Sequence, residues 1–278
     1  MLQRIGFFHF GAEDKTHPVR SLIRALERSI EDHGDRYVED ALIVLPEAFN
    51  IRTTYNNDPP IPTPSYDPGV KACLRMIAAE FRVVFVAGLI VEESAEQARP
   101  FSSAYFLGAH TCKLLARKRW GDQMAGRLYA SCEEWPSVPY LHDDETAVAA
   151  LICIDAQQYR KPEGPPEPCN PEHAALRKRI DETKALRKIL CVPANLKNLL
   201  ETDIESAWQD MDLVVANSSA EKCVSVIKMR NGMRRDEPGK LNKVVVEQLD
   251  QTIQDANARQ ATHDLNASLT VTSVDSNW

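Results

Sequence analysis

The chain has 278 residues, 44% of them hydrophobic and 26% charged, which is ordinary for a globular protein with a substantial core. Its net charge of −7 at pH 7 argues against a nucleic-acid partner, because phosphate binding needs concentrated lysine and arginine. The longest apolar runs fall short of the roughly 20 residues that a membrane span needs, so no membrane partner is predicted.

The numbers and spacing of cysteine and histidine indicate the redox compartment and bear on metal binding. Seven cysteines, an odd number at scattered positions, do not form a disulfide framework and indicate a reducing cytoplasm. The first ten residues lack the pattern of a secretory signal. No CxxC or HExxH spacing occurs and the seven histidines are dispersed, so we expect neither a metal nor another cofactor.

In chain order, the first half alternates buried strands with amphipathic helices. The opening strand, helix and strand predict a largely internal, covered sheet. The helix begins with Pro18 in its first turn and ends at Gly34. The predicted elements are a strand at 4–10, a helix at 18–33, a strand at 41–45, a proline-rich loop at 56–69, a helix at 70–81, a strand at 83–91, and paired strands at 103–107 and 113–116.

The second half continues the alternation, so the whole chain is predicted to be α/β. No break in composition divides it, and we expect one domain over 1–249. The polar segment 250–278 is predicted to be a C-terminal tail, either disordered or docked as an arm on a partner. The predicted elements are a strand at 146–155, a proline-rich loop at 157–171, a charged helix at 172–188, a strand at 189–192, a weaker helix at 196–208, and strands at 213–216, 224–229 and 243–246.

The strand at 146–155, TAVAALICID, places Cys153 where an apolar run gives way to polar sequence. Folds of the α/β class place their chemistry at such strand ends. Cys191 and Cys223 also lie in apolar runs, and a buried cysteine usually serves as a small hydrophobic residue. Local context alone therefore leaves both interpretations of Cys153 open.

Two other reactive side chains follow predicted strands. Glu47 comes directly after LIVLP, and Lys118 follows KLLAR. With Cys153 as nucleophile, a neighbouring lysine lowers the thiol pKa and stabilises an oxyanion, while a carboxylate transfers protons. Taken one at a time, each residue also has an ordinary interpretation. Glu47 could be a surface residue after a strand, and Lys118 could belong to the solvated basic tripeptide at 117–119.

The segments LPEAFN, ARKRWGD and LICID, in this order, resemble the Glu–Lys–Cys signature of the nitrilase (carbon–nitrogen hydrolase) superfamily. The resemblance covers about residues 2–248 and includes VPANL and LVVANSS, which are similar to later strand-end segments of that family. It implies a four-layer α-β-β-α sandwich of the nitrilase type in a single domain. It also implies a small-molecule amide-type substrate and a homodimer or higher homo-oligomer.

The same resemblance implies roles for individual residues. Cys153 is expected to attack the substrate, Glu47 to transfer protons, and Lys118 with the backbone N–H of Ile154 to stabilise the oxyanion. Either Glu133 or Glu134 resembles an additional glutamate that orients the substrate or the lysine. The sequence does not decide between these two.

Three departures from the family pattern bear on substrate preference and activity. The arginine and aromatic residue common after the cysteine–aspartate pair are replaced by AQQYRKPE, the loop at 157–171 looks like an insertion, and ESAWQDMD replaces a family pattern before the VVAN strand. Because CID lacks the Trp-Glu of true nitrilases, an amide-type substrate is favoured over a nitrile. Two alternatives stay open: transfer of the acyl group to an amine, and a non-catalytic interaction or regulatory protein.

Overall fold

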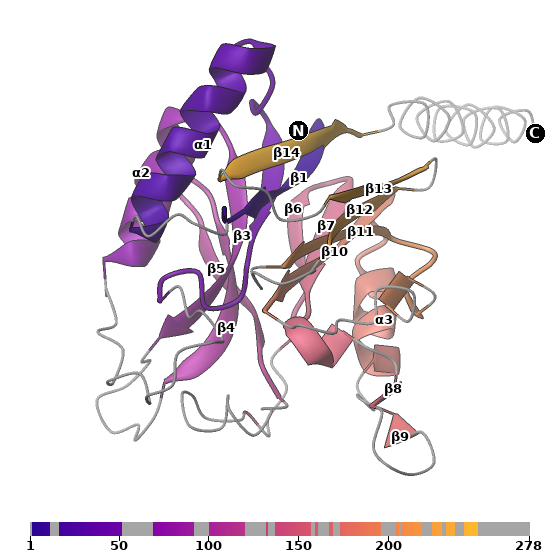
Figure 1. Cartoon of the computed structure of the whole chain (residues 1–278). Coiled ribbons are helices and arrows are strands. Elements are labelled where there is room, and N and C mark those ends of the chain that lie inside the picture. The colour runs from indigo at the N-terminus through magenta and orange to yellow at the C-terminus, as the bar shows by residue number, and fades with distance from the viewer. Residues whose placement is uncertain are drawn as a thin grey trace, which may run out of the picture. The chain divides into compact units, whose positions relative to one another are not determined.

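The structure, a computed structural model, is an α/β fold built on two six-stranded mixed sheets (Figure 1). The chain divides into two units, Met1–Gln248 and Leu249–Trp278, and both sheets belong to the first. The tail predicted over 250–278 lies outside the described residues. These are 2–11, 17–51, 69–91, 100–119, 132, 137–156, 159–160, 167–168, 173–195, 204–205, 207–217, 224–229, 232–236 and 242–249.

The first sheet has the strand order β14-β1-β2-β3-β4-β5. Strands β1, β2 and β3 run parallel, whereas β4, β5 and β14 join by antiparallel pairing. The parallel strands therefore place their carboxyl ends at one edge of the sheet. The strands are β1 (Arg4–His9), β2 (Ala41–Leu45), β3 (Val84–Val91), β4 (Phe101–Leu107), β5 (Cys112–Arg117) and β14 (Lys243–Gln248).

The second sheet has the order β13-β12-β11-β10-β7-β6, with β7, β10 and β11 parallel in its centre. Two further short strands, β8 (Tyr159–Arg160) and β9 (Glu167–Pro168), pair with each other within the predicted loop at 157–171. The strands of the sheet are β6 (Tyr140–Asp143), β7 (Thr146–Ala150), β10 (Arg187–Ala194), β11 (Asp212–Asn217), β12 (Ser225–Met229) and β13 (Gly232–Asp236).

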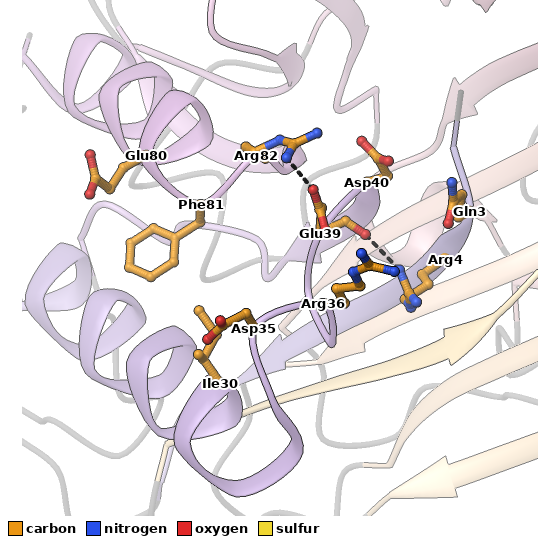
Figure 2. Close-up of a pocket in the computed structure, with 10 residues that line it drawn as sticks. All are labelled: Gln3, Arg4, Ile30, Asp35, Arg36, Glu39, Asp40, Glu80, Phe81 and Arg82. Carbon is orange, nitrogen blue, oxygen red and sulfur yellow. Dashed lines mark hydrogen bonds and ion pairs between the residues drawn. The ribbon is translucent and has the colours of Figure 1, made fainter.

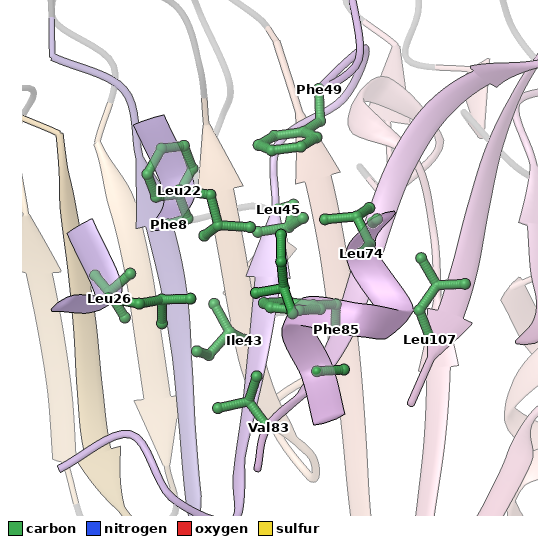
Figure 3. Packing of buried hydrophobic residues seen from close by; sticks show 14 of the residues in the cluster. Phe8, Leu22, Leu26, Ile43, Leu45, Phe49, Leu74, Val83, Phe85 and Leu107 are labelled. Carbon is green, nitrogen blue, oxygen red and sulfur yellow. The ribbon is translucent and has the colours of Figure 1, made fainter. Parts of the chain in front are cut away.

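Helices α1 (Pro18–His33) and α2 (Val70–Glu80) cover one face of the first sheet (Figure 1). Figure 3 shows the core between them, where Ile43 and Leu45 of β2 meet side chains such as Leu22 of α1 and Leu74 of α2. Leu42 and Val44 are equally buried but lie outside this cluster, because successive side chains of a strand point to opposite faces. Both faces of β2 are covered, which explains its continuous apolar sequence.

The opposite face of the first sheet contacts the second sheet. The backbone N–H of Glu47, just past β2, donates to the carbonyl of Ala194 in β10 at 3.4 Å. Gly88 of β3 permits this approach, since a Cβ there would lie 2.8 Å from the Cα of Glu47 and 2.7 Å from the Cβ of Pro193. Contacts that short do not occur in relaxed structures, so the absence of a side chain at residue 88 sets the spacing of the sheets.

We expect Gly88→Ala to displace Glu47 and to destabilise the fold by about 1–3 kcal/mol, the usual cost of overpacking a core. The proton transfer that the resemblance implies for Glu47 should slow by about 10²-fold, as expected for a displacement near 1 Å. Gly108→Ala is the matched control, because a Cβ there would make ordinary contacts of 3.5 and 3.8 Å. Denaturant unfolding and turnover of the two variants check this; equal behaviour would contradict it.

A buried histidine also joins the two sheets. His9, at the end of β1, is 1% exposed, and its Nδ1 lies 3.2 Å from the Oγ of Ser225 in β12. Within the described residues its Nε2 has no hydrogen-bond partner. Burial, reinforced by the charge of Lys243 and opposed by that of Asp236, lowers the pKa of His9 from 6.5 to about 4. His9 is therefore neutral in the native protein at pH 7.

This shift makes stability fall in acid. Below pH 6.5 the unfolded chain binds a proton at His9 that the native protein rejects until about pH 4. Between pH 7 and pH 4 we expect the free energy of unfolding to drop by about 3 kcal/mol through this residue. Urea unfolding across that range checks it: His9→Gln should flatten the pH dependence, and the matched change at exposed His33 should not.

Several boundaries predicted from the sequence are wrong. The charged helix predicted at 172–188 ends early as α3 (His173–Glu182), and 187–188 already belong to β10. Two residues past α3, Lys184 has a φ of 55°, in the left-handed region, which does not continue a helix. The strands β6 and β13 were not predicted. No helix within the described part of the chain is long and apolar enough to cross a membrane.

Candidate active site

The three predicted catalytic side chains come from both sheets. Glu47 follows β2 and Lys118 follows β5 of the first sheet, whereas Cys153 follows β7 of the second. All three are buried, with exposed fractions of 4%, 3% and 0%. Glu133 and Glu134 lie outside the described residues, so neither prediction about them is tested.

Glu47 and Lys118 form a buried ion pair with 2.8 Å between Nζ and Oε1. The hydroxyl of Ser102, in β4, donates to the same Oε1 at 3.1 Å. Two charges withdrawn from water are stable only when such bonds compensate the loss of hydration. The pair therefore has a fixed geometry, with Lys118 and Ser102 on one oxygen of the carboxylate.

The Cys153 thiol lies beside this ion pair. It is within hydrogen-bonding reach of the Glu47 carboxylate and of the backbone of Asn195, and it experiences the charges of both Glu47 and Lys118. Cys153 therefore does not lie in the fully apolar environment that is typical of a cysteine with only a packing role.

The expectation that Lys118 gives Cys153 a lowered thiol pKa is wrong. Burial raises the pKa of the Cys153 thiol well above its ordinary value, and the negative charge of Glu47 raises it further. The positive charge of Lys118 and the hydrogen bond from Asn195 lower the pKa, but they do not offset these effects. Cys153 is consequently a protonated thiol that needs a base, and Glu47 is within reach.

The backbone at Cys153 makes a sharp turn that the sequence did not indicate. The strand predicted to run through 155 ends at Ala150, and Cys153 begins a 3₁₀ turn (Cys153–Ala156) with a φ of 57°. Ala48, next to Glu47, has a φ of 56°. Such values are rare for residues other than glycine and cost about 1–3 kcal/mol, and they cluster at active sites. The N–H of Ile154 lies at the start of the turn, where helical N–H groups lack partners within the turn.

Asp155 connects the Cys153 turn to the Lys118 strand end. It is fully buried, and its Oδ2 accepts the backbone N–H of Arg119 at 2.7 Å. The ring nitrogen Nε2 of His173 lies 2.8 Å from the carbonyl of Asp155, and Trp208 Nε1 donates to the carbonyl of Ala156 at 3.4 Å. Side-chain N–H groups thus hold two consecutive carbonyls of the turn that carries the cysteine.

Ser102 and His173 were missed as site residues by the sequence analysis. For Ser102 the only signal was a serine pair interrupting an otherwise apolar strand, FSSAYFL. For His173 there was none, because it lies at the start of a helix with an ordinary charged pattern.

The large cavity in Figure 2 lies away from these residues. It has a volume of about 720 Å³ and is lined by charged side chains, among them Arg4, Glu39 and Arg82. Arg4 begins β1, and Glu39 and Arg82 lie just before β2 and β3, so the cavity is at the amino ends of these parallel strands. Glu47 is at the opposite, carboxyl end of β2 and has no part in this cavity.

Solved structures similar to this chain include amidases and a carbon–nitrogen hydrolase. A carbon–nitrogen hydrolase from Helicobacter pylori G27 has a TM-score of 0.65 at 14% identity, covering 93% of each chain. A cysteine-to-alanine mutant of the Nesterenkonia AN1 amidase, from the nitrilase superfamily, has a TM-score of 0.57 at 18% identity, covering 94% of this chain and 96% of its own. The chain has the fold of the nitrilase superfamily.

A further structure of that amidase concerns the cysteine. It is a glutamate-to-glutamine mutant showing Michael addition of acrylamide at the active-site cysteine, with a TM-score of 0.58, 18% identity and coverage of 94% of this chain and 99% of its own. No protein-family model matches the sequence, and no curated protein matches it. The nitrilase-superfamily fold was therefore recognisable from a few short segments and from the three-dimensional structure.

Proposed function

We propose that the protein is a thiol hydrolase of the nitrilase superfamily that cleaves a non-peptide, amide-type carbon–nitrogen bond through a Cys153 thioester. The observation that carries the proposal is the buried Glu47–Lys118 ion pair beside a fully buried, protonated cysteine. A core cysteine needs no such pair, and burying two charges beside one without a function is costly.

The first half-reaction begins with the Cys153 sulfur attacking the amide carbonyl carbon while its proton passes to Glu47. Because the thiol pKa is raised, transfer accompanies attack and no free thiolate accumulates. The oxyanion is stabilised by the Lys118 ammonium and the Ile154 N–H. The C–N bond then breaks, Glu47 returns the proton to the nitrogen, and ammonia or an amine leaves.

In the second half-reaction Glu47 removes a proton from water, which attacks the thioester carbonyl. The carbon–sulfur bond breaks, the acid leaves and the proton returns to the Cys153 sulfur. Every proton passes through Glu47, whose position is fixed by Lys118 and Ser102. Acyl transfer differs only in that an amine replaces water.

The remaining features of the proposal follow the resemblance and the composition. We place the two sheets and their helices in a four-layer α-β-β-α sandwich that assembles as a homodimer or larger. The predicted compartment is the cytoplasm, and the predicted partner is a small-molecule amide. Sedimentation at micromolar concentration giving a mass near the 31.2 kDa of one chain would contradict the assembly.

The test is intact-mass analysis of the full chain after incubation with short amides, nitriles and carbamoyl compounds. Acrylamide and butyramide begin the panel, since both are bound in structures of the Nesterenkonia AN1 amidase. We expect an acyl or acrylamide adduct that peptide mapping assigns to Cys153, together with release of ammonia from a substrate.

A panel with hydroxylamine added separates the alternatives. Capture of the acyl group by hydroxylamine, with slow acid formation in water, would favour acyl transfer. No adduct on Cys153 with any compound, including acrylamide, would refute the thiol mechanism and favour a non-catalytic protein.

A further inference from the structure

Two of the groups that contact the Glu47 side chain bind the same carboxylate oxygen. Lys118 Nζ lies 2.8 Å from Oε1, and Ser102 Oγ lies 3.1 Å from it. A carboxylate oxygen offers two lone-pair sites in its plane, so these two bonds fill Oε1. The Cys153 thiol is within hydrogen-bonding reach of the Glu47 carboxylate, and Oε2 is the oxygen that would accept its proton without displacing either donor from Oε1.

Ser102 acts on both members of the ion pair. Its hydroxyl donates to the carboxylate of Glu47, while its backbone carbonyl accepts a hydrogen bond from the backbone N–H of Lys118 at 2.8 Å. The residue is 1% exposed and lies in β4, between β3 and β5, the strand that Lys118 follows. One residue thereby fixes the carboxylate by its side chain and the start of the lysine segment by its main chain.

We propose that Ser102 is a positioning residue for Glu47: its hydroxyl and the Lys118 ammonium hold Oε1, and Oε2 takes and returns the Cys153 proton. This inference rests on the proposed thiol chemistry. It divides the carboxylate into one oxygen that is held and one that transfers protons. A serine with only a packing role would satisfy its hydroxyl on a carbonyl and leave the carboxylate free to rotate.

The neighbouring serine provides a matched control. Ser103 lies in the same strand with the same side chain and is also fully buried, but successive residues of a strand face opposite sides of the sheet. Tyr105, which shares the face of Ser103, belongs to the core under the helices. Ser103→Ala therefore matches Ser102→Ala in size and burial without touching Glu47.

The experiment measures alkylation of Cys153 by iodoacetamide, by intact mass with peptide mapping, between pH 5 and pH 9. The sulfur bonds to the methylene carbon, iodide leaves, and the thiol proton passes to Glu47. We expect Ser102→Ala to slow labelling at pH 7 by about tenfold, because a carboxylate with one donor fewer is held less often in the orientation that takes the Cys153 proton. The slowing should be seen across the whole pH range.

Ser102→Thr restores the hydroxyl and should label within about threefold of the wild type, at the wild-type pH dependence. Ser103→Ala should match the wild type in both. Unfolding in urea is measured for all variants, so that a change in stability is separated from a change in rate.

Three results would overturn the inference. Equal rates and pH profiles for Ser102→Ala and the wild type would leave Ser102 as a packing residue. Equal slowing in Ser102→Ala and Ser103→Ala would assign the effect to the strand. A wild type in which Cys153 is never labelled would remove the proposed thiol chemistry and the role of Ser102 with it, whereas the first two results leave that chemistry intact.

Discussion

Replacing Cys153 with alanine should abolish turnover, with a loss on the order of 10⁴-fold or more, because the proposed thioester forms on the Cys153 sulfur. The fold should remain, since the change removes one sulfur atom from a buried turn and costs about 1 kcal/mol. Turnover of an amide that acylates the wild type, together with denaturant unfolding, measures both effects.

Cys191→Ala is the matched control for this variant. Cys191 is also fully buried, and burial alone raises the pKa of its thiol, with no charged neighbour contributing. We expect Cys191→Ala to retain turnover while losing a similar amount of stability. If both variants kept full activity, Cys153 would be a small core residue and the thiol mechanism would be wrong.

Replacing Lys118 with methionine should damage both activity and stability. The loss of one oxyanion donor costs about 10²–10³-fold in kcat. The change also leaves the Glu47 carboxylate buried without its cation, and breaking a buried pair costs about 3–5 kcal/mol. Lys113→Met, at an exposed residue earlier in the same strand, should do neither.

A double variant separates the two effects of Lys118. In Lys118→Met with Glu47→Gln neither charge remains, so the free energy of unfolding should recover relative to Lys118→Met alone. Activity should not recover, because both the base and the oxyanion donor are lost. A double variant as unstable as the sum of the single variants would show that the pair is not coupled as the 2.8 Å contact implies.

The sequence predicted the strands of the two sheet centres because their burial on both faces requires continuous apolar runs. Residues 41–45 and 213–216 lie within β2 and β11 for this reason. The amphipathic helix α1 was predicted from its apolar spacing, its early proline and Gly34. Glu47, Lys118 and Cys153 lie at the ends of predicted strands, but position alone left each of them open. The resemblance of three short segments to the nitrilase superfamily joined them into one predicted site.

The edge strands and the turns could not be predicted from the sequence pattern. β13 is polar and almost wholly exposed, so GMRRD carries no strand pattern. Lys184 lies two residues past α3 and Cys153 begins the turn after β7. Both have a left-handed backbone without the glycine that usually marks such a position. Ser102 was missed because its role depends on a tertiary contact with Glu47, and a serine in a strand gives no local indication of its partner.

The candidate site is divided between the two sheets, so its activity should depend on how the sheets are docked. Glu47 and Lys118 belong to the first sheet and Cys153 to the second, joined by contacts such as Glu47 N–H to Ala194 and Arg119 N–H to Asp155. Each sheet keeps its own backbone hydrogen bonds even when the two separate slightly. In mild denaturant, inactivation should precede the loss of far-ultraviolet circular dichroism, so that enzymatic activity becomes a sensitive gauge of sheet docking.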